Sequence, residues 1–312
     1  MITLPTHNVF IEGPDCSGKT TLVKNVHNAT AYKWHLMDRS QISRRIFARM
    51  YNRKLPGISY DFKRELFDLN NIFVVLIPEW GTIQERFSKR GDDLHDIDSL
   101  REVYNAFVDS CGDLVNLPNV HIFSSHYLSS PEKTRDCLIS LVSDRESTSL
   151  SKISYEISKL AMASPRREVT GLDLSLFEDT GFEKADSAIL KTPSEKEYYE
   201  SIFYGMMNKI DDEVSGKNEY NLIQTSSSRR FIYTNDSCIS LIHAVSRDRK
   251  LDIHVVMRST DITEKLEHDL NFIYYLSSQI FKRLSKMTKI ELVQIKFNFN
   301  SAHILNHINP VC

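Results

Sequence analysis

Eight residues near the N-terminus, 13–20, fit the phosphate-binding pattern G-x-x-x-x-G-K-[ST]. They follow a short apolar run at 8–12 and open a helical stretch at 19–27, which is the context that the pattern requires. Backbone N–H groups of such a loop wrap phosphate oxygens, and the helix N-terminus adds a favourable dipole. We expect Lys19 to neutralise the β- and γ-phosphates of ATP and Thr20 to bind Mg²⁺. The predicted nucleotide-binding residues are Gly13, Asp15, Ser17, Gly18, Lys19, Thr20 and Thr21.

Charged residues farther along the chain could act on a phosphate held by this loop. The segment 38–40 (Asp-Arg-Ser) follows a second apolar run and passes into an arginine-rich helical stretch. Arg86 and Arg90 are four residues apart, so on a helix they share one face and can reach one anion. A solvated helix face is the alternative for any single charge there. The candidate catalytic residues are Lys19, Asp38, Arg39, Arg86 and Arg90, and the candidate metal ligands are Thr20 and Asp38.

These motifs together resemble the thymidylate kinase and deoxynucleoside kinase superfamily over residues 8–143. The resemblance lies in residues 11–21, in the Asp-Arg-Ser triplet at 38–40, and in 85–92, which is similar to the family's basic lid. It implies that Asp38 acts near the metal and the phosphoryl acceptor, that the arginine after it contacts phosphate, and that ATP is the donor. The stretch between the loop and Asp38 is short for the family, so the base preference of this half stays open.

A second set of chemically useful residues lies in the C-terminal half. Arg229-Arg230 could bind a phosphate dianion, and Cys238, near arginines, could act as a thiolate nucleophile. The segment 258–261 (Arg-Ser-Thr-Asp) follows a further apolar run. Each feature alone is weak, because a cysteine at the start of an apolar strand usually packs in the core and adjacent arginines are usually solvated.

Taken together, these clusters resemble thymidylate synthase and its relatives, the deoxypyrimidine monophosphate hydroxymethylases. Cys238 stands where the family has its nucleophile, and Arg258 follows it by 20 residues, the family's own spacing. The resemblance implies that Arg229 and Arg230 hold the phosphate of a substrate bound to the neighbouring subunit, and hence a homodimer. No residue clearly matches the family's catalytic Glu. The substrate-binding residues so implied are Arg166, Arg229, Arg230, Arg258, Ser259, Asp261 and Asp269.

Asp269 bears on the choice of base. The synthases have an Asn that reads uracil at this position, eight residues after Asp261. A carboxylate offers only acceptors, which suit the exocyclic amino group of cytosine, and the family's hydroxymethylases acting on dCMP carry Asp here. The resemblance therefore points to dCMP rather than dUMP, with 5,10-methylenetetrahydrofolate as a further expected cofactor and with methylation left open beside hydroxymethylation. The alternative for Asp269 is an exposed helix position.

The elements that must position the first set of residues alternate between strand and helix. Strands are expected at 8–12, 32–37, 71–77 and 119–123, with helical stretches between and after them. This order predicts an α/β fold of the P-loop kinase type, in which helices cover both faces of a largely parallel sheet.

The second half has a less regular order of elements. A strand is expected at 168–177, several more follow after 229, and a long helix is expected at 264–285. We therefore predict an α+β domain, and the resemblance described above implies that it is similar to thymidylate synthase. A polar stretch without apolar periodicity at 143–149 marks the boundary, which gives domains at 1–145 and 150–312.

Composition and charge bear on partners and compartment. A net charge of −2 gives no overall positive field, which disfavours nucleic acid and anionic membranes, although this sum says nothing of a local basic groove. Five scattered cysteines without a CxxC pair are typical of reduced thiols in a cytoplasm. No secretory leader is recognisable, and no stretch approaches the ~18 apolar residues of a membrane span. We expect a soluble cytoplasmic protein, in the host cytoplasm if its source is viral.

Three functions are compatible with these observations. The preferred one is a bifunctional enzyme of deoxypyrimidine nucleotide metabolism, whose second half modifies C5 of a monophosphate and whose first half phosphorylates the product. The second is a nucleotide kinase with a degenerate, dimerising synthase-like domain. The third is a kinase acting on modified bases in DNA, which the near-neutral net charge disfavours.

Overall fold

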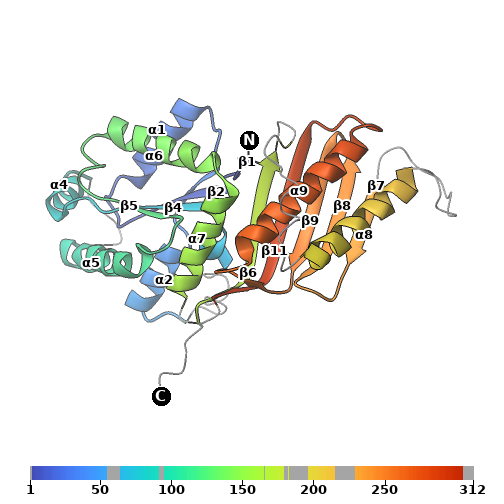
Figure 1. Ribbon diagram of the computed structural model, residues 1–312. Helices are drawn as coiled ribbons and strands as arrows, with labels where there is room; N and C mark the ends of the chain where they lie inside the picture. The colour runs from blue at the N-terminus through green and yellow to red at the C-terminus, as the bar shows by residue number, and fades with distance from the viewer. Residues whose placement is uncertain are drawn as a thin grey trace, which may run out of the picture. The chain divides into compact units, whose positions relative to one another are not determined.

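The chain divides into two compact units in this computed structural model. One unit is Thr6–Glu146, and the other combines Met1–Pro5 with Ser147–Cys312 (Figure 1). The structure describes residues 2–54, 64–90, 95–164, 166–178, 182, 196–214 and 229–304.

A four-stranded parallel sheet forms the centre of the first unit. Its strand order is β3 (Leu36–Asp38), β2 (Asn8–Glu12), β4 (Asn71–Leu76) and β5 (Val120–Phe123). All six residues of β4 are buried. This is expected of a central parallel strand with helices on both faces, and it explains why the sequence of β4 is apolar without alternation.

Helices cover both faces of this sheet and complete three layers. Figure 1 shows α1 (Lys19–Thr30) and α6 (Pro131–Glu146) on one side and α2 (Gln41–Met50) and α5 (Ile97–Leu114) on the other. α4 (Trp80–Arg90) follows β4 along the chain. Apolar side chains of α1, α6 and the sheet form one buried cluster. The predicted α/β fold with a parallel sheet in a three-layer arrangement is confirmed.

The second unit contains a mixed seven-stranded sheet. The order is β1, β6, β11, β9, β8 and β7, with β10 paired to β11. In the described part of this sheet, β11 is parallel to β9 and to β10, and the other pairs are antiparallel. The strands are β1 (Ile2–Thr3), β6 (Glu168–Glu178), β7 (Arg229–Thr234), β8 (Ile239–Arg247), β9 (Lys250–Met257), β10 (Thr260–Asp261) and β11 (Leu292–His303).

Three helices lie along one face of this sheet: α7 (Leu150–Ala163), α8 (Lys196–Val214) and α9 (Leu266–Leu284) (Figure 1). α9 matches the expected long helix, and its apolar stripe is buried. On β8, Ile242 and Ala244 are buried while the alternate residues are only half-buried, so the other face of the sheet carries less cover. No helix in the described part of either unit is long and apolar enough to cross a membrane.

The N-terminal strand changes the division of the chain that the sequence suggested. The break falls between Glu146 and Ser147, within the expected polar stretch, but the first five residues belong to the second unit. β1 pairs with β6 through Ile2 and Glu178, and Leu4 is 2% exposed. The first unit therefore begins at Thr6 rather than at residue 1, because a two-residue strand too short to show periodicity completes the edge of the other sheet.

Candidate functional site

Two glycines shape the loop between β2 and α1. Gly13 has φ +141°, and a Cβ there would lie 2.5 Å from the carbonyl oxygen of Leu76. Gly18 has φ +101° and is the N-cap of α1. Any other residue would be strained at both positions. The loop consequently folds tightly over the end of β4 and presents its backbone to a ligand.

Lys19 lies beneath this loop. Its Nζ donates hydrogen bonds of 2.8 Å to the carbonyl oxygens of Gly13 and Pro14, and its side chain is 6% exposed. Burial lowers the pKa of Lys19, and the nearby Asp15 and Asp38 carboxylates oppose that shift. Two carbonyl oxygens of the loop therefore hold the buried ammonium group in place.

The loop also holds a polar atom without a partner. Ser17 is 3% exposed, and among the described residues its Oγ has no hydrogen-bond partner. Thr20 and Thr21 are exposed in the first turn of α1. An unsatisfied buried hydroxyl, a buried lysine and a helix N-terminus fit the phosphates of a nucleotide.

Three side chains meet at the edge of the loop. Nη2 of Arg39 donates to Oδ1 of Asp15 over 3.0 Å, and Nε2 of His95 lies 3.7 Å from Oδ2 of the same carboxylate. Arg39 has φ +78°, and its N–H donates to the carbonyl oxygen of Ile11. This left-handed turn at the end of β3 directs the arginine towards the loop, while Asp38, beside it, is exposed.

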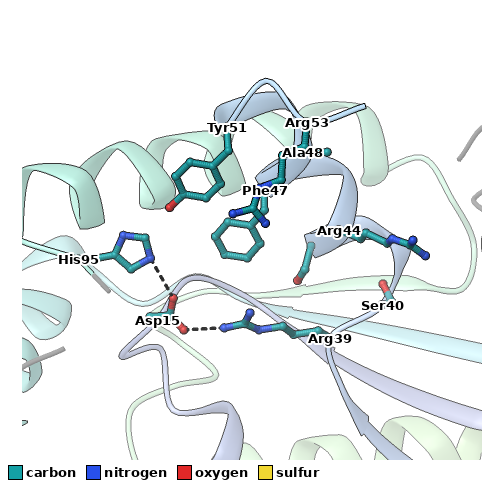
Figure 2. Close-up of a pocket in the computed structure, with 10 residues that line it drawn as sticks. Asp15, Arg39, Ser40, Arg44, Phe47, Ala48, Tyr51, Arg53 and His95 are labelled. Carbon is teal, nitrogen blue, oxygen red and sulfur yellow. Dashed lines mark hydrogen bonds and ion pairs between the residues drawn. The ribbon is translucent and has the colours of Figure 1, made fainter. Parts of the chain in front are cut away.

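A cavity of about 610 Å³ opens beside this cluster (Figure 2). Phe47 and Tyr51 stack with their ring centroids 6.2 Å apart. The guanidinium of Arg39 lies 5.2 Å from the centroid of Phe47, and that of Arg53 lies 4.9 Å from that of Tyr51. The lining residues are Asp15, Arg39, Ser40, Ser43, Arg44, Phe47, Ala48, Tyr51, Arg53 and His95. The aromatic rings suit a flat ring, and the arginines suit an anionic group attached to it.

Glu12 is a buried carboxylate that the sequence motifs did not single out. It is fully buried at the end of β2, and it accepts hydrogen bonds from the backbone and hydroxyl groups of Ser40 and Ser43. Burial raises the pKa of Glu12, and these hydrogen bonds oppose the shift. Glu12 thereby ties the strand before the loop to the first turn of α2, which lines the cavity.

The structure describes only part of the predicted basic lid, residues 85–90. Nη1 of Arg86, on α4, donates to the carbonyl oxygens of Cys16 and Ser17 over 3.1 and 2.9 Å. Arg90 is exposed at the end of α4, and the Gly91-Asp92 pair lies outside the described residues. The structure thus puts Arg86 at the loop, whereas nothing in the described residues joins Arg90 to the same point.

The residues expected to hold Mg²⁺ provide oxygen ligands. Within the described residues, no group of three or more His, Cys, Asp and Glu side chains could hold a metal ion by itself. Thr20 supplies a hydroxyl, and Asp38 is close enough to Lys19 to affect its pKa. Mg²⁺ commonly takes one or two protein oxygens and completes its shell with substrate phosphates and water, so these two residues fit an ion that arrives with the nucleotide.

In the second unit, the structure brings Cys238 and the 258–261 segment together. Sγ of Cys238 lies 4.0 Å from Oγ of Ser259, and the N–H of Arg258 donates to the carbonyl oxygen of Cys238 over 2.7 Å. The N–H of Ile239 donates to the hydroxyl of Tyr198 over 3.0 Å, and burial raises the pKa of that tyrosine to about 12. Cys238 is half-buried, and Arg258 is exposed.

Asp261 and Asp269 both have partners inside the protein. Asp261 is 5% exposed and accepts hydrogen bonds from the backbone and side chain of Thr263. Asp269 is 2% exposed, and its two oxygens accept hydrogen bonds from the hydroxyls of Tyr199 and Thr260. Asp269 is therefore not an exposed helix residue: its two oxygens join α8, α9 and β10. Each carboxylate oxygen can accept a further hydrogen bond, so base reading by Asp269 stays a prediction.

Arg230, one of the arginines expected to bind phosphate, lies far from Cys238 in this chain. Arg230 pairs with Val245, seven residues along β8 from Cys238, which is roughly 23 Å at a rise of about 3.3 Å per residue. Arg230 is exposed, and the side chain of Arg229 lies outside the described residues. Arg166 is exposed just before β6.

Solved structures similar to parts of this chain include nucleotide-binding proteins. The YorR protein of Bacillus subtilis, in complex with phosphorylated GDP, matches 44% of this chain and 95% of its own, with 16% identity and a TM-score of 0.35. Deoxyadenosine kinase from M. mycoides, with dCMP and dCDP bound, matches 44% and 98%, with 10% identity and a TM-score of 0.33. Thymidylate synthase from T4 phage matches 33% and 36%, with 17% identity and a TM-score of 0.22. No protein-family profile and no curated protein matches the chain in sequence.

Proposed function

We propose that the first unit is an ATP-dependent kinase that phosphorylates a nucleotide. The observation that carries this proposal is the position of Asp15, which belongs to the phosphate-binding loop and also lines the adjacent cavity. A donor on the loop and an acceptor in the cavity would be neighbours. Direct phosphoryl transfer requires such proximity, and most of its catalysis is positioning and charge stabilisation.

The charged residues around the loop have distinct roles in this proposal. Lys19 exchanges the carbonyls of Gly13 and Pro14 for the terminal phosphates of the donor, and its burial strengthens that attraction because the local dielectric is low. Arg86 is already at the loop and stabilises charge on the transferred group. Bound MgATP, held through Thr20 and Asp38, supplies the phosphoryl group and the divalent charge. Arg39 and Asp15 orient the acceptor.

We take a deoxypyrimidine monophosphate as the first acceptor to test. The cavity, at about 610 Å³, has the size of a small-molecule site. Phe47 and Tyr51 provide a surface for a base, and Arg39 and Arg44 provide charge for a phosphate. The choice of a pyrimidine comes from the resemblance of the second unit and not from the cavity itself.

ADP formation from ATP with each deoxynucleoside monophosphate tests this function. The wild type should phosphorylate at least one of them, and Lys19→Ala should lose more than about a hundredfold in rate, as the removal of a charge-stabilising group typically does. Lys24→Ala, a change of an exposed lysine on α1, is the matched control and should keep full activity. A wild type that binds ATP but phosphorylates none of the monophosphates would overturn the proposal.

For the second unit we propose a C5-modifying site on a deoxypyrimidine monophosphate, with dCMP and dUMP as the candidates. Its support is that Sγ of Cys238 approaches Oγ of Ser259 and that the backbone of Arg258 is hydrogen-bonded to that of Cys238. In this proposal the exposed Arg258 side chain binds the phosphate. In this proposal the Cys238 thiolate adds to C6 of the ring and makes C5 nucleophilic. Methylenetetrahydrofolate is the one-carbon donor that the sequence resemblance implies, and no residue is assigned to it.

A specific observation favours a degenerate second unit instead. Asp269, the residue implied to read the base, has both oxygens bound within the protein. Tritium release from C5-labelled dCMP and dUMP, with and without methylenetetrahydrofolate, distinguishes the two cases. Release that disappears in Cys238→Ala supports the C5-modifying site. If neither nucleotide releases tritium while ATP-dependent phosphorylation persists, the second unit is a binding module beside a kinase.

We also propose that the second unit forms a homodimer with a shared site. Arg230 lies on β7 and pairs with Val245 of β8, which is too far from Cys238 for the two to share a site within one chain, and Arg230 is exposed. An arginine that completes the site of the neighbouring subunit would account for both facts. Arg230→Ala should weaken monophosphate binding by more than about 1 kcal/mol, a typical loss for a charge-assisted contact. A monomer in sedimentation would contradict this arrangement.

A further inference from the structure

One segment of the first unit has a charge unlike that of the whole chain. Between residues 39 and 54 there are six basic residues and no acidic one, whereas the chain as a whole has a net charge of −2. The segment consists of the turn after β3, α2, and the four residues that follow it. All six basic side chains are exposed: Arg39, Arg44, Arg45, Arg49, Arg53 and Lys54. We call this segment the basic track.

The basic track adjoins the acceptor cavity and also extends beyond it. Arg39, Arg44 and Arg53 line the cavity (Figure 2), whereas Arg49 and Lys54 do not. A single nucleotide in the cavity needs only the arginines that line it. The basic residues outside it add positive charge that a mononucleotide would not use.

Four of the six basic residues form no ion pair with any residue that the structure describes. Arg39 pairs with Asp15, but among the described residues neither Arg44, Arg49, Arg53 nor Lys54 forms an ion pair within 4.0 Å. α2 is held in place independently of any ligand, because Glu12 binds Ser40 and Ser43 at its first turn. A fixed helix with exposed cations beside an aromatic-lined cavity has the features of a single-strand binding surface, in which backbone phosphates meet arginines and a base stacks on a ring.

We propose that the basic track binds the phosphate backbone of a single-stranded nucleic acid whose terminal nucleotide occupies the cavity. This inference rests on the proposed function, because the cavity is taken as the acceptor site, and it extends the acceptor class from a free nucleotide to one carried by a strand. Arg49 and Lys54 contact phosphates outside the cavity, and Phe47 and Tyr51 stack on the terminal base. The net charge of the chain does not reveal this surface, because the acidic residues lie elsewhere in the sequence.

Binding of a fluorescent 12-nucleotide single-stranded DNA, measured over a series of salt concentrations, tests the surface. The variant Arg49→Ala/Lys54→Ala removes charge only outside the cavity, and Lys24→Ala/Lys133→Ala removes the same charge from exposed positions on α1 and α6. We expect the first variant to bind the DNA at least about tenfold more weakly at low salt. The slope of log K against log salt concentration should become shallower by about 1.4, since each phosphate contact on a single strand contributes about 0.7 to it. The control variant should bind as the wild type does.

Competition separates this inference from the kinase proposal. The oligonucleotide should inhibit mononucleotide phosphorylation competitively with the acceptor and not with ATP, and the Arg49→Ala/Lys54→Ala variant should resist this inhibition while phosphorylating free mononucleotide at the wild-type rate. Active mononucleotide phosphorylation without oligonucleotide binding would overturn the strand surface and leave the kinase intact. Oligonucleotide binding without any phosphoryl transfer would overturn the kinase alone. Equal binding of polyglutamate would show a general polyanion surface and also overturn the inference.

Discussion

The carboxylate of Asp15 accepts a hydrogen bond of 3.0 Å from Nη2 of Arg39, and it thereby joins the loop between β2 and α1 to the wall of the cavity. The two residues are 24 positions apart in sequence and come from the ends of neighbouring parallel strands, β2 and β3. The carboxyl ends of parallel strands meet at one edge of a sheet, which is where open α/β proteins bind their ligands. A change at Asp15 should therefore act on the cavity and not only on the loop.

Asp15→Asn should raise the KM for the acceptor roughly threefold to tenfold and leave the KM for ATP nearly unchanged. Arg39 is about half exposed, so its ion pair with Asp15 has the modest strength of a surface pair. The rise in the KM for the acceptor should therefore not exceed about tenfold. Steady-state kinetics with each substrate varied in turn measures this. Glu132→Gln, at an exposed acid on α6, is the matched control. An equal rise of both KM values would show that Asp15 serves the loop alone.

Leu4→Ala should destabilise the second unit and not the first. Leu4 is 2% exposed and belongs with β1 to the second unit, and Leu→Ala changes in a core cost about 2–5 kcal/mol. In calorimetry, ATP should raise the unfolding transition of the unit that binds it, which identifies the other transition. Leu4→Ala should lower the transition that ATP does not shift. Leu114→Ala, a buried leucine of α5, should lower the other one; the reverse assignment would contradict the division of the chain.

Gly205→Ala should destabilise the second unit, because α8 passes very close to β7 at this point. A Cβ on Gly205 would overlap Cε2 of the Tyr233 ring. Such overpacking costs about 1–3 kcal/mol. Gly112→Ala on α5 is the matched control, because nothing lies within 4 Å of its added Cβ, and it should stabilise its helix by about 0.5–1 kcal/mol. Urea unfolding of both variants measures the difference, and equal effects would show that Tyr233 moves aside freely.

His121 should make the stability of the first unit depend on pH. Burial, with the nearby charge of Arg145 in addition, lowers the pKa of His121 from 6.5 to about 4. Between these two values the unfolded chain binds more protons than the folded one, so the free energy of unfolding falls as the pH falls from 6.5 towards 4. The contribution of His121 to this loss at pH 5 is about 2 kcal/mol.

Urea unfolding at pH 7 and pH 5 tests this dependence. The wild type should lose more stability on acidification than His121→Leu, which carries no titrating ring. His126→Leu, at an exposed histidine five residues along the chain, is the control and should behave as the wild type does. A wild type and a His121→Leu variant with the same pH dependence would show that His121 titrates normally.

The geometry of the loop at 13–20 was predictable from the sequence, because it depends on the order of neighbouring residues. The pattern at 13–20 fixes a glycine where the loop meets Leu76, a lysine that reaches back to the loop, and a helix that begins at once. The strand sequences likewise predicted the parallel sheet, since a strand covered on both faces must be apolar throughout. Cys238 and Arg258 lie close together because the antiparallel strands β8 and β9 bring the residues at their outer ends together.

Other features became visible only in the tertiary structure. The cavity is lined by residues from the loop, from α2 and from His95, and their assembly depends on the sheet order rather than on any spacing. Glu12 ties β2 to α2 because it is buried against Ser40 and Ser43, and Asp269 is buried where the hydroxyls of Tyr199 and Thr260 bind its two oxygens. The N-terminal strand joins a sheet formed more than 160 residues later. Local sequence determines which element forms and what its side chains can do, but the partners of a side chain are set by packing between distant segments, which no local pattern records.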